Sequence, residues 1–508
     1  METNTKPKTT RNVVIAVLSF FITLSSWSFS SSIGSGGDID AHISSIWCAW
    51  GEKKGMCEND NGFVATVPYM FQMCDGRPID SWQGCEIIAS STSMQELRII
   101  GPQQRSIYYS VMRIFADTNP RQSIVTMRLV NSFIASLILF GLLKFTTGRT
   151  RIAAISSLTL TLVPVAVRTI SSINPHGWAD ISVMTSWAFL HGFLSAPKSH
   201  NRKKILFVFY VFSVLLAATT RVDATTYTVF TSSVVLLHHF VSRRRISRND
   251  IIALMGISAV GIAVVGFSQV VRNYLTFPMP PGNAFGQYLL FQITHIPESL
   301  VEVFGYAVGQ QGNGPGLVGI IGLSLFVTAL IFSLQNASKV GFVFFGIVML
   351  FLALVMYKGA LLVNSLVPLP GTYALGLMTF LLGMSIIASP AEQQFLSHKG
   401  NRIAVVSLLS IAHALTLYSW MELYTRGNQA PGFFNAQTLG ESSNLSLSGG
   451  WWWNSWSNPN WVFLIGVTSF PVFLHYAWRV VNADLVLRNS SDFNVSDSVT
   501  KSPLITIA

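Results

Sequence analysis

Two carboxylates and a histidine lie close together in the stretch Ile33–Gly51, directly after a hydrophobic segment that is long enough to cross a bilayer. A carboxylate at a membrane surface can act as a general base and deprotonate an acceptor hydroxyl. On a helix that starts near Asp38, the side chains of Asp38 and His42 would share a face at i, i+4 spacing, with Asp40 between them. Asp38 could equally serve as the N-cap of that helix, so both interpretations stay open.

A second group of aromatic and basic residues follows on the same polar segment. Tyr108 and Tyr109 precede Arg113, a pattern that suits a segment lying in the membrane interface. The guanidinium group of Arg113 matches phosphate geometry and is a candidate contact for a lipid phosphate, with plain interfacial anchoring as the alternative. Arg128 and Asn131 then lie inside the next hydrophobic segment, where ionisable groups indicate a functional site.

Further polar residues recur near the ends of later hydrophobic segments. Arg168 closes one of them, and the turn Ser172–Asp180, which contains Asn174, leads into the next. Arg221 and Asp223 lie between two more. Together these groups favour an anionic ligand, whereas a structural Arg221–Asp223 pair and simple turn formation are the alternatives.

A tryptophan-rich run, GGWWWNSW at Gly449–Trp456, precedes the last hydrophobic segment. Tryptophan next to a bilayer most often belongs to the aromatic belt at the membrane interface. Aromatic faces also stack on sugars, which is the functional alternative for this run.

All four cysteines fall inside the first long polar segment, at Cys48, Cys57, Cys74 and Cys85. An even number of cysteines on a segment expected outside the cell predicts two disulfides in an oxidising compartment. Pairing of neighbours, Cys48 with Cys57 and Cys74 with Cys85, is preferred among three connectivities. A zinc site is the alternative, but it normally needs tighter cysteine spacing.

The composition determines which elements must position these residues. The chain has 508 residues, half of them hydrophobic and only 11% charged, and its mean hydropathy is positive. A soluble protein of this length could not cover its surface with so few charges. The sequence therefore predicts an all-α polytopic membrane protein.

About twelve apolar segments are long enough to cross a ~30 Å hydrocarbon core. They cover residues 12–30, 123–143, 152–171, 178–195, 205–220, 224–241, 251–270, 315–334, 340–357, 370–388, 403–421 and 460–478. Lys and Arg gather in alternate connections, which by the positive-inside rule predicts a multi-pass protein of the cell membrane with both termini in the cytoplasm. The net charge of +11 is thus a topology signal and does not indicate nucleic-acid binding.

The expected organisation is one transmembrane domain with three long polar segments on the outer face. Residues 1–11 form the cytoplasmic N-terminus, and 481–508 form a flexible cytoplasmic tail. The domain covers 12–480 and includes the exoplasmic loops 31–122, 271–314 and 422–459. Long ordered loops are usually functional, so this asymmetry places the active site on the exoplasmic face.

Several common catalytic motifs are absent from the sequence. It contains no Walker loop, no GxGxxG after a strand, no GxSxG elbow and no HExxH. ATPase, nucleotide-sugar and hydrolase chemistry are therefore disfavoured. An enzyme of this kind would need an activated donor that is already in the membrane.

The order of these motifs resembles the GT-C superfamily of membrane glycosyltransferases, in which a first span precedes an outer loop with an acidic pair. More closely, the chain resembles a family of actinobacterial polytopic membrane proteins with GT-C-like topology and a first-loop motif of the form Asp-Glu/Asp-x-x-His. The similarity covers about residues 12–480. The matching residues are Asp38, Asp40, His42, Ile46-Trp47-Cys48, Tyr108-Tyr109 before Arg113, Arg128 with Asn131, Asn174-Pro175 with Trp178, Arg221 with Asp223, and Trp451–Trp453.

The resemblance implies an inverting glycosyltransferase that uses a polyprenyl-phosphate sugar and a glycan or glycolipid acceptor of the cell envelope. Asp38 and Asp40 would be the catalytic residues, with Asp38 as the general base. The substrate-binding residues would be His42, Arg113, Arg128, Asn131, Asn174, Arg221 and Asp223. No cofactor is certain; if a divalent cation, Mg²⁺ or Mn²⁺, takes part, Asp38 and Asp40 are its expected ligands.

One departure from the pattern leaves alternatives open. Ile39 stands where the resembling proteins commonly carry an acid, with the second carboxylate at Asp40. A secondary transporter or flippase for an envelope lipid would instead require inverted repeats with broken helices at the bilayer midplane, and no repeat is evident. A GT-C-like scaffold that has lost its chemistry is the third interpretation.

Overall fold

The computed structural model of the chain is mostly helical. It describes residues 6–30, 39–61, 64–68, 94–99, 107–196, 201–243, 287, 290–291, 294, 296–305, 316–335, 337–363, 374–389, 398–426 and 458–499. The elements are α1 Lys6–Phe29, α2 Ile39–Trp47, β1 Val64–Pro68, β2 Met94–Arg98, α3 Ile107–Met112, the 3-10 helix η3 Arg113–Phe115, α4 Pro120–Phe145, α5 Gly148–Thr161, α6 Pro164–Ser171, α7 His176–Ser195, α8 Asn201–Thr220, α9 Val222–Arg243, α13 Ile296–Gly305, α14 Gly316–Gln335, α15 Lys339–Val363, α16 Leu375–Ala388, α17 Lys399–Arg426 and α18 Pro459–Val499.

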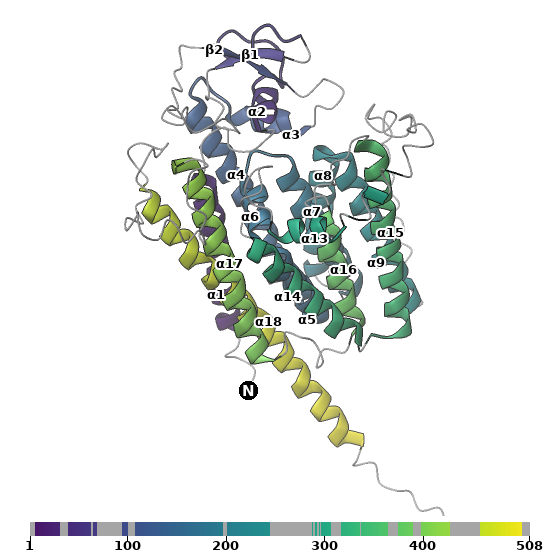
Figure 1. Ribbon diagram of the computed structural model, residues 1–508. Coiled ribbons are helices and arrows are strands. Elements are labelled where there is room, and N and C mark those ends of the chain that lie inside the picture. Colours follow the sequence, from purple (N-terminus) through teal and green to yellow (C-terminus); the bar gives the residue numbers. More distant parts are fainter. Residues whose placement is uncertain are drawn as a thin grey trace, which may run out of the picture.

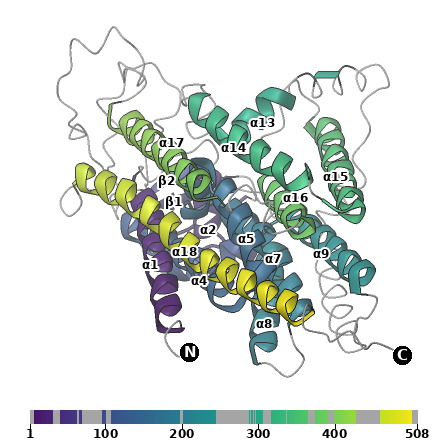
Figure 2. The same cartoon turned by 90° about the horizontal axis from the view of Figure 1, so that it is seen from below.

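Long helices lie side by side and form a bundle (Figure 1). The first and last helices, α1 and α18, pack along each other, and α1 also packs on α4 (Figure 2). In the interior, α7 contacts α8, α9 and α16, and it is buried from Gly177 to Leu194. A helix that is surrounded by other helices is largely apolar on every side, and most of α7 fits this rule.

The two ends of the bundle differ. Figure 1 shows α2, α3, β1 and β2 together at one end, which we call the loop end. At the opposite end, Lys144 Nζ donates a hydrogen bond to Thr10 Oγ1 at 3.1 Å, and Arg151 forms an ion pair with Asp484 at 3.3 Å. Segments far apart in the sequence therefore meet at this end of the bundle.

Fewer than twelve of the described helices pass a strict test of length and apolarity for crossing a membrane. Of the helices in the described ranges, six are long and apolar enough to cross a membrane, or seven if α5 and α6 count as one bent span. The predicted spans 178–195 and 224–241 coincide with α7 and α9, but Ser, Thr and His residues make these two helices less apolar than the six that pass the test. The predicted span 251–270 lies outside the described residues, so twelve spans stay a prediction.

The predicted span 152–171 is not one continuous helix, because the chain bends by 93° between α5 and α6. Pro164 is the first residue of α6, and it has no backbone N–H with which to continue the hydrogen bonds of α5. The last turn of α5 ends in a bond from Leu162 N to Leu158 O at 2.7 Å. Pro164, although it lies inside a continuous apolar run, thus begins a new helix.

The first predicted loop contains strands as well as helices, which corrects the all-helical expectation. β1 and β2 pair antiparallel, with Val64 opposite Arg98 and Pro68 opposite Met94. A disulfide joins Cys48 to Cys57, which is the preferred neighbour pairing, whereas Cys74 and Cys85 lie outside the described residues. The disulfide ties the end of α2 to the segment that leads into β1.

Candidate functional site

Of the predicted catalytic pair, Asp40 lies at the loop end of the bundle, at the start of α2. Asp38 is outside the described residues; Ile39, which follows it in the chain, is the first residue of α2. Asp40 belongs to the first turn of α2, and only its backbone is described. The tryptophan run Gly449–Trp456 also lies outside the described residues.

His42 is buried on α2 and held by α3. Its exposed fraction is 5%, and its Nδ1 lies 2.7 Å from the hydroxyl oxygen of Tyr109. The two rings also stack, with centroids 5.9 Å apart. This contact joins two of the segments that the sequence motifs single out.

Asn131 connects three further segments in the same region. Its Nδ2 donates to the hydroxyl of Tyr108 at 3.2 Å and to the carbonyl oxygen of Ser172 at 2.5 Å. Its Oδ1 accepts a hydrogen bond from the indole nitrogen of Trp178 at 2.8 Å. Burial raises the pKa of Tyr108, and the hydrogen bond from Asn131 opposes that shift. We call His42, Tyr108, Tyr109, Asn131 and Trp178 the aromatic cluster.

Removing the central amide is expected to destabilise the protein. In Asn131→Leu, the indole N–H of Trp178 and the hydroxyl of Tyr108 stay buried without this partner, and each such group costs about 1–3 kcal/mol. Thermal unfolding in detergent, followed by tryptophan fluorescence, measures the effect against Phe133→Leu, which changes an exposed residue of the same helix. Equal unfolding midpoints for the two variants would contradict the role given to Asn131.

The turn between α6 and α7 is set by close backbone packing. Asn174 Oδ1 accepts a hydrogen bond from the backbone N–H of His176 at 2.9 Å, so Asn174 shapes the turn. A Cβ on Gly177 would lie 2.7 Å from the carbonyl oxygen of Thr169. Only glycine fits there without a backbone shift.

Gly177→Ala is therefore expected to move this turn and to lower stability by about 1–3 kcal/mol, the usual cost of overpacking. Gly400→Ala is the matched control, because nothing lies within 4 Å of the added Cβ there and alanine favours helix. Thermal unfolding midpoints of the two variants in the same detergent give the comparison. A Gly177→Ala midpoint at or above that of Gly400→Ala would refute the packing argument.

The predicted arginines do not converge on one point. Arg113 donates from Nη1 to the carbonyl oxygen of Ala116 at 3.0 Å and lies over the ring of Trp50, 5.5 Å from its centroid. Burial lowers the pKa of Arg113, and the nearby charge of Asp117 opposes that shift. Arg128 is buried and donates to the carbonyl oxygen of Ser28 in α1 at 2.9 Å.

Arg168, another of the predicted arginines, stacks on an aromatic ring. Its guanidinium carbon lies 3.8 Å from the centroid of the Trp420 ring. The contact joins α6 to α17 and is a cation–π interaction. Arg168 thus packs between helices.

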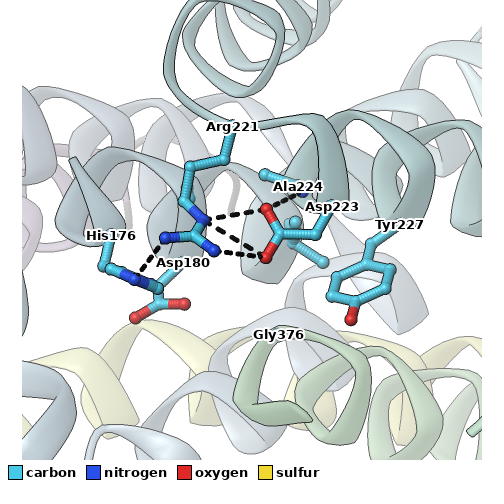
Figure 3. A pocket seen from close by; sticks show the side chains of 9 residues that line it. His176, Asp180, Arg221, Asp223, Ala224, Tyr227 and Gly376 are labelled. Carbon is cyan, nitrogen blue, oxygen red and sulfur yellow. Dashed lines mark hydrogen bonds and ion pairs between the residues drawn. The ribbon is translucent and has the colours of Figure 1, made fainter. Parts of the chain in front are cut away.

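Arg221 and Asp223 form a second site, a pocket between α7, α9 and α16 (Figure 3). Arg221 Nε donates to Asp223 Oδ1 at 2.9 Å, and its Nη2 donates to Oδ2 at 3.0 Å. Arg221 Nη1 lies 2.5 Å from His176 Nε2. Because guanidinium is only a donor, His176 Nε2 accepts, which fixes the proton of a neutral ring on Nδ1.

The electrostatics of this pair favour the charged form of the acid. Burial acts to raise the pKa of Asp223, but the charge and the hydrogen bonds of Arg221 outweigh it and hold that pKa below its usual value. The predicted structural pair between Arg221 and Asp223 is therefore present, and it lines the pocket.

Three lining residues were not among the predicted substrate-binding residues. His176 and Asp180 lie one turn apart on α7, and Tyr227 lies on α9 (Figure 3). The i, i+4 spacing of His176 and Asp180 at a helix start was the available signal. α16 closes the pocket at Gly376, where a Cβ would lie 2.7 Å from the Cβ of Val183, so the helices approach closely.

Within the described ranges, one set of potential metal ligands comes together, formed by Cys48, Cys57 and Asp60. The two sulfur atoms form the disulfide and are not thiolates. The structure therefore gives no support to a zinc site at these cysteines.

The fold and the buried polar groups define a helical membrane protein with several apolar spans. Residues 20–387 match a family described as predicted membrane protein, DUF2142, and the chain belongs to this family. The match spans the first loop, the aromatic cluster and the pocket. No curated protein and no solved structure matches the chain.

Proposed function

We propose that this protein is an inverting glycosyltransferase that moves a sugar from a polyprenyl-phosphate donor to a glycan or glycolipid acceptor of the cell envelope. Asp38 takes the proton of the acceptor hydroxyl while the hydroxyl oxygen attacks the anomeric carbon. The bond from that carbon to the phosphate oxygen breaks, and polyprenyl phosphate leaves with the electron pair. The leaving phosphate is already ionised, so the reaction needs no general acid.

The convergence of the sequence motifs supports this proposal. The aromatic cluster joins α2, the helix that Asp38 precedes in the sequence, to α3, α4 and the start of α7. His42, one turn along α2, is buried and bonded to Tyr109, which holds α2 in one orientation. A general base requires such a rigid support.

Among the arginines, Arg113 suits the donor phosphate best. Among the described residues, Arg113 donates hydrogen bonds to a carbonyl oxygen and to the sulfur of Met56, whereas Arg221 is held by a carboxylate. An anionic phosphate would bind Arg113 more strongly than these neutral partners do. The substrate-binding helices are then positioned by other predicted residues, namely Arg128, Asn131, Asn174, Arg221 and Asp223.

The alternation of basic connections supports the exoplasmic face as the site of reaction. With both termini cytoplasmic, the loop end faces outward and meets donor and acceptor in the outer leaflet. Mg²⁺ or Mn²⁺, if required, would be held by Asp38 and Asp40.

A transporter or flippase is the second candidate, and the bend between α5 and α6 favours it. Transporters bind their substrates at broken helices, and here the break of 93° follows Thr161. The aromatic cluster at the loop end favours the transferase.

Purified protein in detergent separates the two candidates, because a transferase needs no sealed compartment. A radiolabelled polyprenyl-phosphate sugar and envelope glycolipids should yield a labelled acceptor in detergent, and a deletion strain should lose one glycosyl linkage. Transport without product, seen only in sealed vesicles, would overturn the transferase assignment.

A further inference from the structure

The pocket between α7, α9 and α16 carries an excess of negative charge. Arg221 is matched by Asp223, and its Nη1 is engaged by the neutral ring of His176. Asp180 adds a second carboxylate (Figure 3). Among the described residues that line the pocket, two carboxylates thus face one guanidinium.

Asp180 is buried, and one of its carboxylate oxygens has no hydrogen-bond partner among the described residues. Its exposed fraction is 7%, and its Oδ2 makes no hydrogen bond to any residue that the structure describes. A buried, unpaired carboxylate is costly unless it is protonated or meets a positive group. Because Asp180 lines the pocket, a positively charged ligand that enters the pocket can contact its carboxylate directly.

We propose that this pocket binds a small monovalent cation, with Asp180 as its anionic ligand. The cation brings the charge of the pocket to zero, and its attraction to Asp180 is strong because few water molecules screen it. The ring of Tyr227 lines the same pocket, and an aromatic face also attracts a cation. An anion would instead meet an unpaired carboxylate.

The size of the pocket limits the ligand. Its space measures about 260 Å³, open solvent at the mouth included. An alkali-metal ion or the ammonium group of a larger molecule fits, and both share the chemistry of a monovalent cation.

Protons should compete with the cation for Asp180. The titratable groups that face Asp180 are His176 on α7, Arg221 before α9, and Asp223 and Tyr227 on α9, whereas Gly376 on α16 contributes none. Over the pH range in which Asp180 is protonated, the apparent affinity for the cation should fall about tenfold for each unit by which the pH is lowered. Binding is thus expected to strengthen as the pH rises.

Thermal unfolding of the full-length protein in detergent tests cation binding independently of the transferase reaction. Wild-type protein is titrated with NaCl, KCl, methylammonium chloride and ethanolamine hydrochloride, with N-methylglucamine chloride keeping ionic strength constant. A saturable rise in the midpoint of roughly 2–5 °C is expected at ~100 times Kd. A rise in the midpoint with Na⁺ or K⁺ identifies the ligand as an inorganic ion. A rise with methylammonium or ethanolamine identifies it as an organic ammonium group.

Two variants keep the test decisive. Asp180→Asn should lose the cation-induced rise and, because it removes a buried unpaired charge, should unfold at or above the wild-type temperature without cations. Glu96→Gln, an exposed position in β2, makes the same change of charge and should keep the rise. No saturable rise in the wild type, or an equal rise in Asp180→Asn, would overturn the proposal.

Discussion

Replacing Asp38 with asparagine is expected to lower sugar transfer by about 10²–10⁴-fold, the usual contribution of a general base. The amide keeps the size of the carboxylate but cannot take the proton of the acceptor hydroxyl. Donor binding depends on phosphate contacts, so KM for the polyprenyl-phosphate sugar should change little while kcat falls. Initial rates with radiolabelled donor and purified protein measure both constants.

Asp60→Asn provides the matched control for this variant. Asp60 lies in the same first loop, beyond the Cys48–Cys57 disulfide, and has no role in the proposed reaction. Asp40→Asn shows whether the second acid takes part. Asp38→Asn with wild-type kcat and a normal unfolding midpoint would eliminate the proposed mechanism.

Removing the acid of the Arg151–Asp484 ion pair is expected to cause the largest loss of stability. The side chains of Arg151 and Asp484 are 7% and 12% exposed, and Asp484 Oδ2 also accepts from the backbone N–H of Gly148 at 2.9 Å. Asp484→Leu leaves a buried guanidinium without its partner, which typically costs about 3–5 kcal/mol. Unfolding in mixed micelles with increasing SDS measures this free energy.

A double-mutant cycle separates the pair from its surroundings. Arg151→Leu combined with Asp484→Leu should be less destabilised than the sum of the single changes, because no unpaired charge remains. The ion pair lies at the end of the bundle opposite the loop end, so residual folded Asp484→Leu should retain transfer activity. A loss below about 1 kcal/mol for Asp484→Leu would show that the pair behaves as a surface salt bridge does.

Local patterns in the sequence predicted most helices and one polar contact. Apolar runs such as 12–30 and 123–143 coincide with α1 and α4, because helix formation depends on neighbouring residues. Arg221 and Asp223 are close in sequence, so their ion pair was foreseeable. Pro164 was visible too, but the apolar run around it concealed the bend between α5 and α6.

Tertiary structure alone decided which distant polar groups meet. Asn131 and Trp178 are 47 residues apart, and His42 and Tyr109 are 67 apart. Arg151 and Asp484 are 333 apart. Such contacts depend on which faces of packed helices oppose each other, and no periodicity within one helix specifies that choice. The sequence thus determined the helices and the inventory of polar residues, while packing determined that Asn131 joins the aromatic cluster and that Asp180 is buried in the same pocket as Arg221.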